Sequence, residues 1–208
     1  MHSLSEEQQH ILQFILQGKN VIVDAVAGTG KTTLVLGIAA ALNNKKILQV
    51  TYNAALRKDV QQRVSEEGLH NLQVHTYHSL AKQHYLDVGY TDKEIRKALM
   101  NQVEPHNKIR EIDVLVIDEC QDMTHLYFQL LLKYLYDMNK QVQLIVLGDY
   151  KQGLYEFKGA DTRFLTMARE FWKDSKFLQT SEIELVTMKM SFRITNQIRE
   201  FVNNVMLG

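Results

Sequence analysis

Short apolar runs alternate with longer stretches of helical periodicity along most of the chain. The apolar runs are rich in β-branched residues and predict strands over Asn20–Asp24, Lys46–Thr51, Leu72–Thr76, Val114–Asp118, Leu144–Gly148 and Ile183–Met188. The stretches between them predict helices over Glu6–Gln17, Thr32–Leu42, Ala54–Glu66, Tyr77–Tyr85, Thr124–Asp137, Asp161–Phe171 and Asn196–Met206. Wholly apolar strands that alternate with helices predict an α/β fold, a parallel sheet with helices on both faces.

One charged stretch, Asp87–Glu111, interrupts this alternation and contains the single proline of the chain, Pro105. Thr91 and Glu94 have the spacing of a capping box, which predicts a short helix running to about Val103. A length of 208 residues suits one α/β domain. We therefore predict a single domain over residues 1–208 with a small helical insertion at 87–111.

The segment AVAGTGKTT, Ala25–Thr33, follows the first predicted strand and is typical of a phosphate-binding loop. Glycines let the backbone approach phosphate, and the N–H groups at the start of the next helix face the anion. In this pattern Lys31 reaches the β- and γ-phosphates and Thr32 ligates Mg²⁺. The alternative is a glycine turn that opens an ordinary helix, because Ala25 replaces the glycine of the strict pattern. The predicted nucleotide-binding residues of the loop are Ala27, Gly28, Thr29, Gly30, Lys31, Thr32 and Thr33.

The run VLVIDECQD, Val114–Asp122, places acidic residues directly after a buried apolar strand. Ligands of parallel α/β sheets bind beyond the carboxyl ends of the strands. We expect Asp118 to hold Mg²⁺ through water and Glu119 to orient and deprotonate the attacking water. The alternative is a solvated acidic turn. Cys120 directly follows Glu119 and is interpreted as a packing residue.

The composition of the chain limits the partners and the compartment that can be expected for it. Lys and Arg number 24, Asp and Glu also 24, so the formal net charge is zero and any nucleic-acid contact must be local. We expect no membrane span, because no apolar run reaches the roughly 18 residues that a span requires. The N-terminus does not resemble a secretory signal, and one cysteine fits a reducing compartment. An intracellular protein is expected, in the cytoplasm or nucleoid of a bacterium or the nucleus of a eukaryote.

Seven segments occur in the order found in one helicase family: LSEEQQHIL, AVAGTGKT, VTYNAALRKDV, VHTYHSL, VIDECQD, LGDYKQGLYEFKGAD and MSFRITNQI. With them the chain resembles the N-terminal RecA-like (1A) motor domain of superfamily 1 DNA helicases of the UvrD/Rep/PcrA type. The SFR form and the short insertion are similar to the F-box DNA helicase branch. The phosphate loop of the UvrD/Rep/PcrA-type helicases also tends to have Ala in its first position.

The resemblance implies further nucleotide contacts. Gln8 would hydrogen-bond the adenine edge, although Ser5 and Gln8 also have the spacing of a capping box. Gln152 would sense the γ-phosphate, and Phe192 would stack on the base. Arg193 would stabilise transition-state charge on the phosphate. The alternative for Arg193 is a surface cation at the start of a helix.

The resemblance also implies a track for single-stranded DNA. Aromatic side chains stack on bases in such tracks, while polar and basic side chains contact phosphates. The alternative for each aromatic residue is core packing. The predicted stacking residues are Tyr52, Tyr155 and Phe157, and the predicted phosphate contacts are Asn53, Thr76 and Lys158.

The function that the resemblance implies is an ATP-dependent translocase or helicase acting on single-stranded DNA, with ATP and Mg²⁺ as cofactors and 3′-to-5′ polarity. Such motors use a second RecA-like domain of the same longer chain. Alone, this domain is expected to be monomeric and to bind Mg·ATP, but to hydrolyse it poorly. Two alternatives remain: a nucleotide-binding switch or scaffold without unwinding activity, and an RNA-directed relative.

Overall fold

A computed structural model describes residues 3–153 and 159–192 of the chain. Six strands in this part form one sheet with the order β3-β2-β4-β5-β1-β6, and every neighbouring pair is parallel. The strands are β1 (Asn20–Ala25), β2 (Ile47–Thr51), β3 (Leu72–Thr76), β4 (Val114–Ile117), β5 (Gln143–Gly148) and β6 (Ile183–Met188). Each corresponds to a predicted apolar run.

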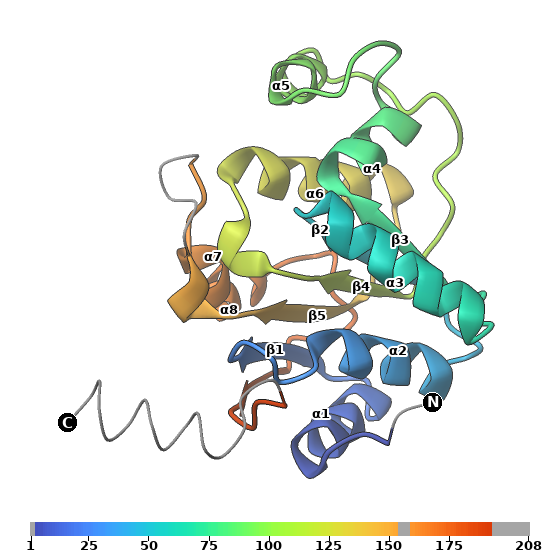
Figure 1. The fold of residues 1–208 in the computed structure, drawn as a ribbon. Helices are drawn as coiled ribbons and strands as arrows, with labels where there is room; N and C mark the ends of the chain where they lie inside the picture. Colours follow the sequence, from blue (N-terminus) through green and yellow to red (C-terminus); the bar gives the residue numbers. More distant parts are fainter. Residues whose placement is uncertain (1–2, 154–158, 193–208) are drawn as a thin grey trace.

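Helices cover both faces of this sheet (Figure 1). Their bounds are α1 (Glu6–Leu16), α2 (Lys31–Ala41), α3 (Ala54–Glu66), α4 (Tyr77–His84), α5 (Asp92–Met100), α6 (His125–Met138), α7 (Arg163–Thr166) and α8 (Ala168–Trp172). Two short 3₁₀ turns, η1 (Cys120–Asp122) and η2 (Tyr150–Gln152), follow β4 and β5. The predicted helix at Asn196–Met206 lies outside the described residues.

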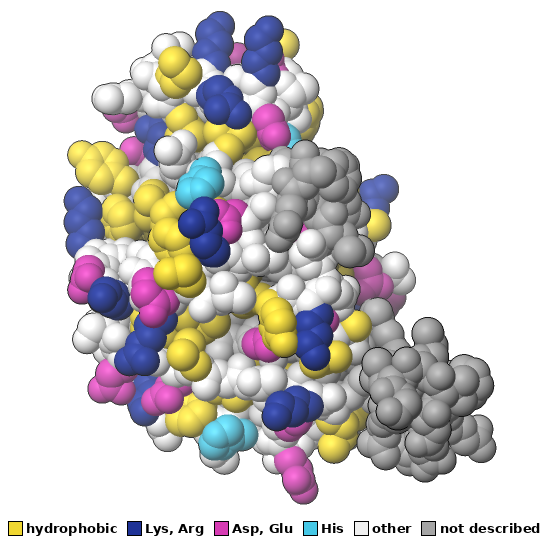
Figure 2. Space-filling model, turned by 90° about the vertical axis from the view of Figure 1, so that its left-hand side faces the viewer, with side chains coloured by type: hydrophobic (Ala, Val, Ile, Leu, Met, Phe, Trp, Pro, Cys, Tyr) yellow, Lys and Arg dark blue, Asp and Glu magenta, His cyan; other side chains and the backbone are white. Residues whose placement is uncertain are grey.

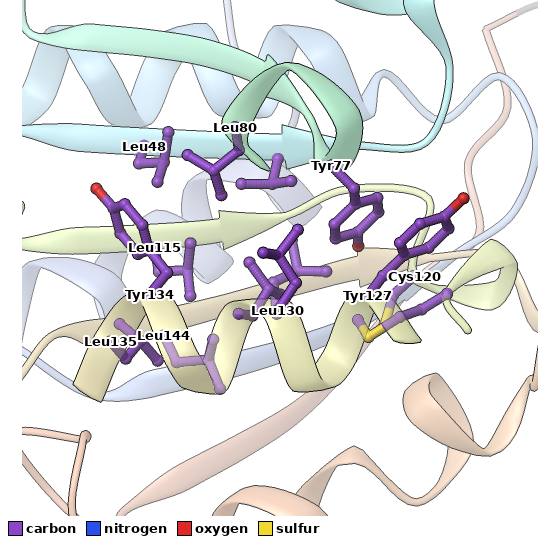
Figure 3. Packing of buried hydrophobic residues seen from close by; sticks show 14 of the residues in the cluster. Leu48, Tyr77, Leu80, Leu115, Cys120, Tyr127, Leu130, Tyr134, Leu135 and Leu144 are labelled. Carbon is purple, nitrogen blue, oxygen red and sulfur yellow. The ribbon is translucent and has the colours of Figure 1, made fainter. Parts of the chain in front are cut away.

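The core consists of two apolar clusters, one on each face of the sheet. In the first, side chains of α1, α2 and α3, such as Ile11, Ile38 and Val60, pack on alternate residues of the central strands. In the second, α4 and α6 cover the opposite face, and Figure 3 shows Leu80, Leu130 and the aromatic rings of α4 and α6 over β2 and β4. This arrangement confirms the predicted α/β fold with both faces covered.

The prediction of one helix over Asp161–Phe171 is wrong. Met167 adopts φ −117° and ψ 23°, so the helix closes after one turn and a second helix begins at Ala168. Phe164 and Trp172 both remain buried in spite of the break. Packing of large side chains against the sheet outweighs local helix propensity here.

The segment 87–111 contains α5 and packs on α4 and α6 through Ile95 and Ala98. Figure 1 shows α5 standing away from the sheet beyond α4. The predicted capping box is wrong: the Thr91 hydroxyl donates to the Glu94 carboxylate, and no side chain caps the helix N-terminus. The helix ends at Met100 rather than Val103, because Gln102 takes a left-handed conformation with φ 49°.

In the part of the chain that the structure describes, no helix combines the length and the apolar character that crossing a membrane requires.

Candidate nucleotide-binding site

The phosphate loop joins β1 to α2 at the carboxyl edge of the sheet. Gly28 and Gly30 have φ values of 79° and 83°, a left-handed conformation that favours glycine. A Cβ atom on Gly30 would also lie 2.6 Å from Nε2 of Gln8. The loop therefore needs glycine at position 30 for its backbone and for the space around it. It ends at Lys31, where α2 begins and where the first N–H groups of the helix have no acceptor within the helix.

Two carboxylates follow β4, which is separated from β1 by β5 in the sheet. Glu119 has a left-handed backbone with φ 50°, and its Oε2 lies 3.3 Å from Nζ of Lys31. Gln121 donates to the same oxygen at 2.8 Å. The loop lysine and the strand-end glutamate thus face each other across the site.

Asp118 lies beneath this pair and is almost fully buried. Its Oδ2 accepts a hydrogen bond from Gln49 Nε2 at 2.8 Å, and its Oδ1 accepts one from the Glu119 N–H at 2.9 Å. Burial, together with the charge of Glu119, raises the pKa of Asp118 from 3.8 to about 7. Burial and Glu119 likewise raise the pKa of Asp122 to about 6. Both raised pKa values reflect negative charge crowded at the end of β4.

A chain of hydrogen bonds links these acids to the turn after β5. Gln121 Oε1 accepts from the Asp149 N–H at 3.0 Å. Asp149 Oδ2 in turn accepts from Gln152 Nε2 at 2.6 Å. Gly148 makes this close approach possible, since a Cβ there would lie 2.7 Å from Gln121 Oε1. Glu119 and Gln152 are therefore held by one connected network.

The carbonyl groups of the phosphate loop are held by two distant segments. Gln8 Nε2 donates to the carbonyls of Thr29 (3.0 Å) and Gly30 (3.2 Å). The Ser191 hydroxyl donates to Ala27 O at 2.9 Å, and the Phe192 N–H donates to Gly28 O at 2.8 Å. We call these contacts the loop clamp. They fix the loop from α1 on one side and from the segment after β6 on the other.

Gln8 also completes the predicted capping box with Ser5, since its Oε1 accepts from the Ser5 N–H at 3.0 Å. Both ends of its amide are thus bonded to protein, and the side chain is buried. Contact with an adenine edge would require the amide to exchange one of these bonds. The role of Gln8 as an adenine reader stays a prediction.

One cavity of about 550 Å³ collects most of the predicted nucleotide residues. Thr29 is the member of the predicted loop set that does not line it; its side chain is buried and its N–H donates to Val26 O. Arg193 lies outside the described residues. The predicted residues that line the cavity are Gln8, Ala27, Gly28, Gly30, Lys31, Thr32, Thr33, Asp118, Glu119, Gln152 and Phe192.

A second cavity, of about 590 Å³, adjoins the first and shares Glu119 and Gln152 with it. Tyr52 and Asn53, two of the predicted DNA contacts, line this second cavity. Asn53 also caps α3 by accepting hydrogen bonds from the Ala55 and Leu56 N–H groups.

Thr76 is the other predicted DNA contact that the structure describes, and it does not line the second cavity. Thr76 is buried and caps α4 together with Ser79. Tyr155, Phe157 and Lys158 lie outside the described residues.

Some residues at the site were not predicted. Asp59 and Arg63 of α3 form an ion pair of 3.3 Å and line the nucleotide cavity. His78 lines the second cavity and pairs with Asp92 of α5 at 2.9 Å. Gln49 was also missed, although a glutamine between Leu48 and Val50 of a buried strand is a visible signal. Cys120 is buried, its thiol donates to Phe164 O, and burial raises its pKa, as suits a packing residue.

Comparisons with known proteins agree with this geometry. The family described as AAA domain matches residues 8–158. The RecBCD enzyme subunit RecB of Buchnera aphidicola is 32% identical over 105 residues, which are 48% of this chain and 9% of that protein.

Solved helicase structures share the fold. The Pif1 helicase of Candida albicans superposes with a TM-score of 0.62 at 22% identity, covering 98% of this chain and 44% of that one. Pif1 from Bacteroides sp in complex with ADP-AlF4 gives a TM-score of 0.54 at 18% identity, covering 98% and 45%. The chain thus spans less than half the length of these proteins. With the family match and the geometry of the site agreeing, the chain belongs to the AAA domain family and has the RecA-like fold of these helicase structures.

Proposed function

We propose that this chain binds Mg·ATP in the nucleotide cavity and is the catalytic half of an ATP-driven motor on single-stranded DNA. The observation that carries the proposal is the convergence of Lys31, Glu119, Asp118 and Gln152 on one cavity beside a glycine-rich loop. These groups come from the ends of β1, β4 and β5, where ligands of parallel sheets bind.

The residues present suit Mg²⁺. Thr32 and Asp118 offer hydroxyl and carboxylate oxygens, the ligand type that Mg²⁺ prefers. Within the described residues, no three His, Cys, Asp or Glu side chains form a metal cluster. That fits an ion held by one or two protein oxygens together with phosphates and water. When bound, Mg²⁺ would neutralise charge on the β- and γ-phosphates.

The protein groups divide the chemistry between them. Lys31 binds the β- and γ-phosphate oxygens, which draws its ammonium away from Glu119. The freed carboxylate of Glu119 then orients a water molecule and accepts its proton as the water oxygen bonds to the γ-phosphorus. The bond from that phosphorus to the β–γ bridging oxygen breaks, and ADP carries the released charge. Gln121 keeps Glu119 in place, and we propose that Gln152 senses the γ-phosphate and Arg193 stabilises the transition state.

The nucleotide cavity and the second cavity share lining residues, which supports coupling between nucleotide and DNA. Glu119 and Gln152 line both cavities, so a change at the phosphate can reach the cavity of Tyr52 and Asn53.

Figure 2 shows Lys, Arg, Asp and Glu side chains mixed over most of one face of the molecule. This mixture suits strand binding by local contacts and stacking rather than by bulk charge. By family resemblance, we propose 3′-to-5′ movement, a second RecA-like domain as partner and an intracellular, monomeric protein.

Fluorescence anisotropy of a labelled single-stranded oligonucleotide, with and without Mg·ATP, tests the proposal. We expect the DNA affinity of the chain to change at least about threefold when Mg·ATP is added, and Tyr52→Ala to lose roughly 1–3 kcal/mol of binding. Nucleotide binding without any DNA binding would favour a switch or scaffold. Equal or tighter binding of an RNA strand of the same sequence would favour an RNA-directed motor.

A further inference from the structure

Gln49 is a polar residue between the apolar Leu48 and Val50 in the middle of a buried strand. It lies on β2, is fully buried, and is paired in register with Val74 of β3 and Val116 of β4. Every residue of β2 is buried, so the strand offers its side chains no contact with water. An apolar side chain would fill this position at lower cost.

The amide of Gln49 is only half satisfied. Its Nε2 donates to Asp118 Oδ2 at 2.8 Å, while its Oε1 has no hydrogen-bond partner among the described residues. The hydroxyl of Thr51, which is buried two positions further along β2, is likewise unpartnered in the described part of the chain. A buried unpaired acceptor costs about 1–3 kcal/mol. Packing alone therefore gives no reason for a glutamine at this position.

The contact has a clear effect on Asp118. Gln49 holds one carboxylate oxygen and the Glu119 N–H holds the other, so the plane of the carboxylate is fixed from two sides. Hydrogen bonds of this type orient carboxylates that ligate metals, and their loss typically lowers metal affinity 10–100-fold.

We propose that Gln49 is a positioning residue that orients Asp118 toward Mg²⁺ and so sets the metal dependence of nucleotide binding. The inference rests on the proposed function. Gln49 does not contact the metal or the nucleotide; it acts through Asp118.

The test measures binding of a fluorescent ATP analogue to the 208-residue chain across a Mg²⁺ titration and in EDTA. Gln49→Met removes the donor and keeps the side-chain length. We expect the Mg²⁺ midpoint to rise at least about tenfold, with affinity in EDTA changed less than twofold. Gln49→Asn, which keeps an amide but is one methylene shorter, should raise the midpoint in the same direction.

Gln143→Met is the matched control. Gln143 is a buried glutamine of β5 that donates to Ile15 O and Lys19 O, at the end of the sheet away from the phosphate loop. We expect this variant to lower the melting temperature and to leave the Mg²⁺ midpoint unchanged. An unchanged midpoint in folded Gln49→Met would overturn the inference.

A measurement on the unsubstituted protein does not depend on the variants folding. The side-chain amide NMR resonance of Gln49 should shift when Mg²⁺ is added to the nucleotide-bound protein, and that of Gln143 should not. An unmoved Gln49 resonance would overturn the inference while the proposed function stands. Failure of the unsubstituted chain to bind nucleotide at all would count against the proposed function itself.

Discussion

At the scale of single residues, Glu119 is the carboxylate best placed for catalysis. It faces Lys31 across the cavity, and Gln121 holds it from behind. In the complete motor, Glu119→Gln should keep ATP binding and lower turnover by roughly 10²–10⁴-fold, because the amide cannot accept a proton. Steady-state phosphate release checks this, with Glu170→Gln on the exposed face of α8 as control. Retained turnover would remove Glu119 from the role of base.

His75 gives a prediction for stability. Burial lowers its pKa from 6.5 to about 4, and the nearby Arg57 adds to the shift. The unfolded chain therefore binds more protons between pH 6.5 and 4. Above pH 6.5, His75 is neutral in both states and costs no stability. As the pH falls toward 4, protonation of His75 in the unfolded chain lowers the free energy of unfolding.

Replacing His75 isolates this effect. We expect His75→Gln to recover roughly 1–2 kcal/mol of the stability that the unsubstituted protein loses between pH 6.5 and 4, allowing for screening at a half-buried ring. Urea unfolding at both pH values measures it, with exposed His70→Gln as control. Equal acid sensitivity of His75→Gln and the unsubstituted chain would contradict the assignment.

Residues in local motifs could be predicted from the sequence, and residues brought in from far away could not. Lys31, Asp118 and Glu119 lie in or just after short recognisable segments at strand ends, so their place around one cavity could be predicted. Gln49 and Asp118 are 69 positions apart, and Ser191 and Ala27 are 164 apart. Contacts over such separations depend on strand order, which apolar periodicity does not specify.

At the scale of elements, the loop clamp joins α1 and the segment after β6 to the phosphate loop. Glu7, in the first turn of α1, accepts hydrogen bonds from the backbone N–H groups of Lys189 and Met190. Glu6 lies in the same turn and is exposed. Both acids interact similarly with the helix dipole, so comparing them separates the hydrogen bonds of Glu7 from the effect of the dipole.

Glu7→Ala should therefore destabilise the chain by roughly 1 kcal/mol more than Glu6→Ala, because it leaves two N–H groups without their acceptor. Hydrogen exchange should also become faster at the amides of Lys189 and Met190 in Glu7→Ala alone. Thermal unfolding and exchange mass spectrometry make the two measurements. Identical behaviour of the two variants would show that the bonds of Glu7 to Lys189 and Met190 contribute nothing measurable.

The elements themselves were largely predictable, because their apolar patterns agree with the periods of strands and helices. The break at Met167 and the missing cap at Thr91 were not. Both depend on tertiary packing around α7 and on the position of α5 over α4 and α6.

At the scale of the whole molecule, the proposal that a second RecA-like domain completes the site predicts weak catalysis by this chain alone. We expect slow ATP hydrolysis that single-stranded DNA does not raise severalfold, because an arginine of the partner domain would supply much of the rate. A coupled-enzyme assay with and without oligonucleotide measures it. Robust DNA-stimulated turnover by the 208 residues would contradict the need for a partner domain.

The central claim is that Lys31 and the glycine loop form an ATP site with the acids of β4. Isothermal titration calorimetry of the chain with ATP in the presence of Mg²⁺ tests it most directly. The test variant is Lys31→Ala, and the control is Lys97→Ala, at an exposed position of α5. Our account predicts one ATP per chain, at least about tenfold weaker affinity for Lys31→Ala, and unchanged affinity for Lys97→Ala. Binding that is absent in the unsubstituted chain, or equally tight in Lys31→Ala, would contradict it.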